Sequence, residues 1–344
     1  MKYREKMKRL KEIVQKGSIS EDAIKFVEKC TQNVRTGKYA GEVLVHIKKY
    51  SALQDRINEL HECENITDKD MDIIEEAAAS MYNSDRAEAA ELLIKANSER
   101  AKKLLYKLAE DKCDTVRVSA YDSLGLGNFR SEELYVYFLG KLNKEASRLA
   151  RGYIISNLTD MYKESGIGNR KELLEIFSER LEKTEGIEKA VSLCLLVLLG
   201  EGGYIKDIFE GFNCEDPYVR LWYLIAARDI TDKNNYKLIS ERVSDSFKDE
   251  KIPFINERLE IVYSMIDKIK RNEDFKSEIL EQIAKGNDYL SIREVLVKYR
   301  DSGINKEDML EMLDDMRKNS DTEDMILDLM DMVSGFCRRE LDVY

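Results

Sequence analysis

Residues that usually carry catalytic or metal chemistry are sparse in this chain. Only two histidines occur, His46 and His61, and the second lies in the run His61-Glu62-Cys63-Glu64. Side chains on one helical turn point in different directions, so this run does not converge on one metal ion. Histidine-dependent nucleophilic catalysis needs a Ser or Cys close to the imidazole in space. No spacing in the sequence indicates such a pair, so we expect no catalytic, cofactor-binding or metal-binding residues.

Three further runs have simple structural explanations. The glycine-containing run 124–128 lacks the Lys-Ser/Thr of a phosphate-binding loop and follows an expected helix, which indicates a turn. The acidic runs 314–315 and 321–324 could supply oxygen ligands to a hard cation, but they lack the EF-hand spacing and its glycine. We expect these carboxylates to form a solvated acidic face.

Composition limits the class of protein and of partner. The chain has 344 residues, 36% of them charged, a net charge of −11 and only two prolines. A strongly acidic balance disfavours general binding to nucleic acids or anionic membranes. The longest apolar run, 190–199, is short of the about 20 residues that span a membrane. The six cysteines form no CxxC pair and no secretion signal is evident, which favours a reducing cytoplasm.

A short phrase recurs at distances typical of helical repeats. It reads Asp-Thr-Val-Arg at 114–117 and Asp-Pro-Tyr-Val-Arg at 216–220, and a looser copy begins at Asp288. Apolar positions follow each anchor at helical spacing. Aligning the chain on this phrase gives anchors about 30 to 40 residues apart, with a second amphipathic stretch between them: Arg86, Val116, Ala146, Ile187, Val219, Ile255 and Ile292.

Over roughly residues 83 to 300 the sequence resembles the HEAT-repeat family. The resemblance rests on the phrase at 114–117, at 216–220 and after Asp288, although only the copy at 216–220 has the Pro. It implies an all-α fold in which helical hairpins stack into an α-solenoid with a right-handed superhelix. It also implies that the phrase opens the second helix of each hairpin, that this helix lines the concave face, and that Asp and Arg fix the turn and the stacking.

The expected organisation has three parts. Residues 1–82 form an N-terminal helical cap region, 83–302 the HEAT-like repeats, and 303–344 an acidic C-terminal cap with helices starting near Asn305 and Thr322. Met309, Met312 and Met316 share one stripe of the first C-terminal helix. Such a stripe usually packs in a core. A groove that accepts a partner helix is the alternative, because Met repacks easily.

The face opposite the core on each second helix is the expected binding surface. Counting from each anchor, positions two, five, six and nine residues later point away from the core. In the middle of the array these positions combine apolar and basic side chains inside an acidic protein. The predicted partner-binding residues are Tyr121, Arg148, Arg151, Lys189, Leu193, Leu196, Leu221, Ile225 and Arg228.

Two functions are compatible with this surface. The first is a non-enzymatic cytoplasmic scaffold that binds a protein or peptide along its concave face, including an inhibitor or immunity-type role. The alternative is a HEAT-like DNA-binding protein or a DNA glycosylase for alkylated bases, in which Arg148, Arg151, Lys189 and Arg228 contact the duplex. Net charge and the glutamates at both ends of the strip oppose this alternative. The sequence does not indicate an oligomeric state.

Overall fold

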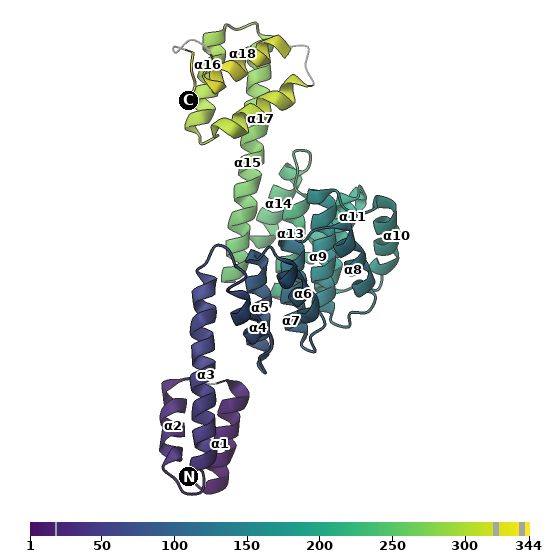
Figure 1. Ribbon diagram of the computed structural model, residues 1–344. Coiled ribbons are helices and arrows are strands. Elements are labelled where there is room, and N and C mark those ends of the chain that lie inside the picture. The colour runs from purple at the N-terminus through teal and green to yellow at the C-terminus, as the bar shows by residue number, and fades with distance from the viewer. Residues whose placement is uncertain (18, 319–322, 337–340) are drawn as a thin grey trace. The chain divides into compact units, whose positions relative to one another are not determined.

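The computed structural model describes residues 1–17, 19–318, 323–336 and 341–344, and within these ranges the fold is all-α (Figure 1). It divides into two compact units, unit 1 (Met1–Ile205) and unit 2 (Lys206–Tyr344). This division falls at neither expected boundary, and the three-part organisation stays a prediction. Asp321, Thr322 and Cys337, which entered the sequence arguments, lie outside the described residues.

Unit 1 consists of eleven α-helices and two short 3-10 helices in the part that the structure describes. In chain order these are α1 (Tyr3–Lys16), α2 (Glu21–Thr31), α3 (Gly37–His61), α4 (Met71–Ala78), α5 (Asn83–Leu92), η1 (Leu93–Lys95), α6 (Glu99–Leu108), α7 (Asp114–Leu126), α8 (Glu132–Leu142), α9 (Arg148–Ser165), α10 (Arg170–Leu181), α11 (Gly186–Leu198) and η2 (Gly202–Tyr204).

Unit 2 contributes seven described α-helices. They are α12 (Ile205–Gly211, whose first residue closes unit 1), α13 (Pro217–Ile230), α14 (Tyr236–Phe247), α15 (Pro253–Ala284), α16 (Tyr289–Asp301), α17 (Lys306–Arg317) and α18 (Glu323–Ser334).

The recurring phrase marks helix starts, as expected. Asp216 is the N-cap of α13, and its carboxylate accepts a hydrogen bond from the Tyr218 main-chain N at 2.9 Å. Pro217 occupies the first helical position, where its missing N–H costs nothing. Asp288 caps α16 in the same way, accepting from the Ser291 main-chain N at 2.8 Å. An acidic N-cap satisfies donors that the first turn would otherwise leave unpaired.

Alternate helices of unit 1 lie side by side. α7 packs between α5 and α9, and α9 packs between α7 and α11, while α6, α8 and α10 each pack on the helix that follows (Figure 1). The close approach of α7 to α9 requires a glycine. A Cβ at Gly125 would lie 2.1 Å from Oδ1 of the buried Asn157, whose amide donates to the Tyr121 carbonyl at 2.7 Å.

The C-terminal part of unit 2 has its own core. Met309, Met312, Leu313 and Met316 of α17 are buried there with Ile326 and other apolar residues of α15, α16 and α18. The methionine stripe therefore packs in a core and does not form an exposed groove.

Candidate functional site

Three of the nine predicted surface residues are buried, so their expected exposure is wrong. Tyr121 is 1% exposed, and Leu193 and Leu196 are 0% exposed. The Tyr121 hydroxyl lies 3.2 Å from both the Ala109 carbonyl oxygen and the Glu145 carboxylate, and its ring lies edge-on to Phe138 of α8. These three side chains belong to the core of unit 1.

Helix α11 is apolar nearly all round because it is covered on several sides. It packs against α9, against α10 and against the 3-10 helix η2 that follows it. The chain after α11 turns back on the helix, since the Glu201 main-chain N donates to the Leu196 carbonyl at 3.0 Å. Arg170 also donates to the Leu199 carbonyl at 2.8 Å. The apolar face that the sequence presents at Leu193 and Leu196 is therefore closed.

The expected repeat position around Ala146 was also wrong. Ala146 precedes α9, which begins at Arg148, so the alignment of this unit was four residues early. Arg151 consequently occupies the fourth residue of its helix, the same place as Arg117 in α7. Lys189, which is half-buried, is the fourth residue of α11.

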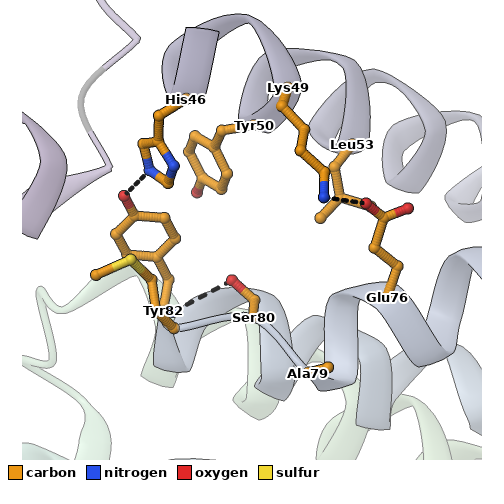
Figure 2. A pocket seen from close by; sticks show the side chains of 9 residues that line it. His46, Lys49, Tyr50, Leu53, Glu76, Ala79, Ser80 and Tyr82 are labelled. Atoms are coloured by element: carbon orange, nitrogen blue, oxygen red, sulfur yellow. Dashed lines mark hydrogen bonds and ion pairs between the residues drawn. The ribbon is translucent and has the colours of Figure 1, made fainter. Parts of the chain in front are cut away.

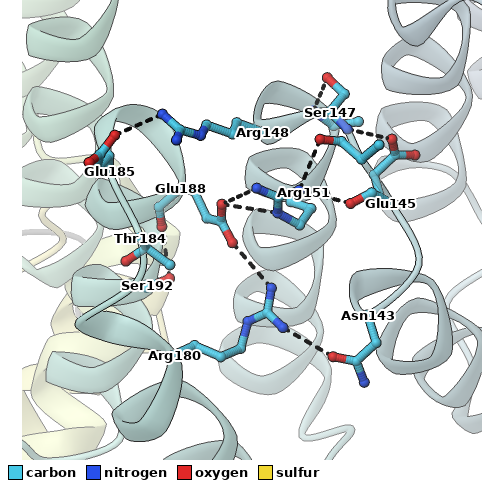
Figure 3. Close-up of polar contacts among 12 residues, drawn as sticks. Asn143, Glu145, Ser147, Arg148, Arg151, Arg180, Thr184, Glu185, Glu188 and Ser192 are labelled. Carbon is cyan, nitrogen blue, oxygen red and sulfur yellow. Dashed lines mark hydrogen bonds and ion pairs between the residues drawn. The ribbon is translucent and has the colours of Figure 1, made fainter.

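The arginines at this fourth position form a series that we call the arginine ladder. In unit 1 each arginine pairs with a carboxylate that lies further along the chain (Figure 3 shows the last pair). The Nη2–oxygen or Nε–oxygen distances are 2.6 to 2.8 Å, and the pairs are Arg86–Asp111, Arg117–Glu145 and Arg151–Glu188.

Each ladder arginine also holds the turn that precedes its own helix. The Nη1 groups donate to the carbonyl oxygen six residues upstream, from Arg86 to Ser80 at 3.0 Å and from Arg117 to Asp111 at 2.9 Å. Asp111 thus uses its carboxylate for one arginine and its main-chain oxygen for the next. Glu145 does the same, since it binds Arg117 through its carboxylate and its carbonyl accepts from Arg151 at 2.8 Å. Successive turns are linked without a break.

Two of the ladder carboxylates, Asp111 and Glu145, have pKa values below the ordinary range. Hydrogen bonding from Arg86 lowers the pKa of Asp111, although burial opposes the shift. For Glu145, burial alone would raise the pKa, but hydrogen bonds from Arg117 and the Ser147 main chain bring it below the ordinary value. Glu188 is 4% exposed and binds both Arg151 and Arg180 (Figure 3). Partnered charges of this kind explain the structure rather than a function.

Arg148 lies outside the ladder. It pairs with Glu185 at 2.8 Å, and both side chains are largely exposed, at 67% and 73% (Figure 3). Such a pair is weak in water because solvent screens it.

Unit 2 contains one arginine–carboxylate pair of the same kind, but other side chains of its helix α13 are partly exposed. Arg220 pairs with Glu250 at 2.9 Å and donates to the Cys214 carbonyl, six residues upstream, at 3.0 Å. Elsewhere on α13, Leu221 and Ile225 are only half-buried, and Tyr218 is 61% exposed. Arg228 is half-buried and pairs with its neighbour Asp229 at 2.6 Å. Of the predicted binding residues, those on α13 thus retain accessible surface.

A separate pocket in unit 1 gathers several polar side chains. It lies between α3 and the end of α4, has a volume of about 280 Å³ and is lined by His46, Lys49, Tyr50, Leu53, Glu76, Ala79, Ser80, Met81 and Tyr82 (Figure 2). His46 Nε2 is 2.8 Å from the Tyr82 hydroxyl, which itself donates to the Val14 carbonyl. A hydroxyl has one proton, so the imidazole must donate through Nε2.

This pocket does not hold a nucleophile beside a base. The Ser80 hydroxyl donates to Asp85 at 2.5 Å, and His46 contacts Tyr82 instead of Ser80 (Figure 2). Asp85 is fully buried and also accepts from Tyr50 at 3.0 Å. Burial, and then the charge of Asp85, raises the pKa of the Tyr50 hydroxyl. The polar groups therefore fix α3 against α5 and offer no acid–base pair to a substrate.

Metal-binding clusters and membrane-spanning helices are both absent from the described residues. No group of three His, Cys, Asp or Glu side chains among the described residues is arranged to hold a metal ion. Within the same ranges, no helix has both the length and the apolar content to cross a bilayer.

Comparison with known proteins adds no relative. No protein-family model matches the chain, and no curated protein is significantly similar to it. The resemblance to HEAT repeats therefore stays a prediction that rests on the chain's own residues.

Sequence reasoning missed the carboxylates of the ladder, although a signal for two of them is present. In Asp111…Arg117 and Glu145…Arg151 an acid precedes an arginine by six residues. This spacing places the acid in the turn and the arginine on the fourth helical residue. Aligning the repeats on that spacing gives the correct position for Arg151, which alignment on Ala146 did not.

Proposed function

We propose that this protein is a non-enzymatic scaffold of the cytoplasm that binds a protein or peptide, built as a HEAT-like, right-handed α-solenoid. Two features support the architecture. Helices α5, α7, α9 and α11 pack in succession, and the arginine ladder links each turn to the next. Repeats that contact only their neighbours create extended binding surfaces.

The observation that carries the binding function is the exposed apolar surface of α13. Tyr218 is 61% exposed, and Leu221 and Ile225 keep part of their surface in solvent on the same side of the helix. Clustered apolar side chains on a protein surface mark interaction sites more often than chance exposure. Aromatic residues contribute strongly to the centres of protein interfaces.

The DNA-binding alternative requires basic side chains that are available to contact phosphates. Three of its four basic residues are ion-paired within the chain, Arg148 with Glu185, Arg151 with Glu188 and Arg228 with Asp229. Phosphate contacts would have to replace these pairs. We therefore expect no salt-sensitive binding of a DNA duplex at low ionic strength, which fluorescence anisotropy measures directly.

Quantitative affinity capture with matched variants tests the proposed function. The intact protein, Leu221→Asp and the control Leu238→Asp are immobilised and exposed to source lysate. Leu238 is 42% exposed on α14, so its substitution places the same charge on a different surface of unit 2. We expect one protein to bind the intact chain and the control but not Leu221→Asp. Equal capture by all three would contradict a binding role for α13.

A further inference from the structure

Helices α13 and α15 together form a surface that mixes aromatic, apolar and basic side chains. The two helices pack against each other, and the rings of Tyr218 and Phe254 stack with centroids 5.0 Å apart. Spacings of three, four and seven residues bring further side chains to the same side of each helix. We call this the aromatic–arginine face: Tyr218, Leu221 and Ile225 of α13 with Phe254, Arg258 and Ile261 of α15.

Arg258 is the unusual member of this face. It is half-buried, and it makes no hydrogen bond or ion pair with the described residues. Burial, and then the charge of Arg228, lowers the pKa of Arg258. Asp229 is the nearby acid, but it already pairs with Arg228 at 2.6 Å. A partly desolvated guanidinium without a carboxylate gains most from an external anion.

The side chains around Arg258 favour a polypeptide as the source of that anion. Glu257 and Glu260 are exposed on either side of Arg258, so they repel a continuous row of phosphates more strongly than one carboxylate directed at Arg258. A peptide places single carboxylates between apolar residues, which matches one arginine among Tyr218, Leu221 and Ile261. Ile261 is 48% exposed and available to such a segment.

A second copy of this chain is a poor source of the segment. Its acidic amphipathic helices near the C-terminus are α17 and α18, and their apolar stripes are already buried in the core of unit 2. Presenting Met309 or Ile326 to another molecule would require that core to open.

Building on the proposed protein-binding function, we infer that the aromatic–arginine face binds an acidic amphipathic segment of a different protein. The apolar side chains of the segment lie on Tyr218, Leu221 and Ile261, and a carboxylate pairs with Arg258. Charge complementarity gives this interface its specificity, and the apolar contacts give most of its affinity.

Labelled helical peptides of about 16 residues provide the probes. One has Leu at helical spacing and a single Glu beside the Leu stripe, the second replaces this Glu by Lys, and the third replaces Leu by Ser. Fluorescence anisotropy with the full chain should show the acidic Leu peptide binding at least about tenfold more tightly than either of the others. Arg258→Glu should remove this preference and favour the Lys peptide, and Arg258→Met should weaken acidic-peptide binding without reversing it.

Arg242→Glu is the matched control, because Arg242 is exposed on α14 and the charge change is the same. It should bind the acidic peptide like the intact chain. The inference is overturned if Arg258→Glu and Arg242→Glu bind the acidic peptide equally. It is also overturned if a single-stranded oligonucleotide binds more tightly than the peptide, or if sedimentation shows a dimer that Arg258→Met dissociates. A partner captured through Leu221 while the acidic peptide fails to bind would leave the proposed function standing and refute only the acidic segment.

Discussion

The arginine ladder of unit 1 and the aromatic–arginine face of unit 2 use similar residues in opposite ways. In unit 1, Arg151 is 18% exposed and meets Glu188 at 2.8 Å. In unit 2, Arg258 is half-buried and meets no carboxylate among the described residues. The apolar neighbours differ too, since Leu193 is fully buried and Leu221 is not.

The difference shows that composition does not separate structure from recognition in this chain. Apolar residues beside arginines occur in both units. What distinguishes them is whether the chain itself supplies the cover and the counter-charge. Unit 1 supplies η2 over α11 and Glu188 beside Arg151. In unit 2, according to the proposal above, a partner protein supplies the apolar cover and the counter-charge at α13 and α15.

The largest expected effect comes from cutting the ladder. Arg151→Ala removes the guanidinium that donates two hydrogen bonds to Oε2 of the buried Glu188, and it should lower the free energy of unfolding by about 3 kcal/mol. Arg148→Ala, which breaks the exposed pair with Glu185, should cost less than about 1 kcal/mol. Urea denaturation followed by circular dichroism measures both, and similar losses would refute the structural role of the ladder.

The second-largest expected effect is a difference in stability loss between leucine-to-alanine substitutions in the two units. Leu193→Ala creates a cavity at a fully buried position of α11 and should cost about 2–4 kcal/mol. Leu221→Ala removes a partly exposed side chain and should cost less than about 1 kcal/mol while weakening partner binding. Thermal denaturation checks both variants. A large loss of stability for Leu221→Ala would mean that α13 is covered in solution.

A smaller and pH-dependent effect is expected at Asp122 of α7. Burial, with a contribution from Glu91, raises the pKa of Asp122 to about 6. The folded state therefore binds this proton more tightly than the unfolded chain, whose carboxyl titrates near about 4. Stability should fall as pH rises from about 4 to 6 and stay lower above it.

Asp122→Asn should remove that loss and stabilise the protein by about 1 kcal/mol at pH 7, with little change at pH 4. Asp245→Asn, at an exposed position of α14, is the control and should have no effect at either pH. Melting curves across this pH range make the measurement. A stabilisation that does not vary with pH would exclude titration of Asp122 as its cause.

The sequence predicted the helices and their starts well, because those features are local. Asp216, Pro217 and Asp288 mark helix starts through contacts within a few residues. The burial of Met309 followed from the period of one helix in the same way.

The surface was harder to predict because exposure depends on distant segments. Leu193 looks available within α11 alone, but α9, α10 and η2 all pack against that helix. Arg151 looks free within α9 alone, but its carboxylate lies 37 residues later. Neither fact follows from spacing within one helix. The sequence also could not predict that Arg258 lacks an ion pair among the described residues, because this depends on Asp229 pairing with Arg228.

The double use of Asp111 and Glu145 has a consequence for how this protein can change in length. Each of the three arginines of unit 1 donates to a carbonyl six residues upstream, whereas arginine and carboxylate are separated by 25, 28 and 37 residues. The turn is therefore intolerant of insertion, but the stretch between rungs is not. The number of residues between one rung and the next therefore varies from 25 to 37 while the arginine–carboxylate pair is kept.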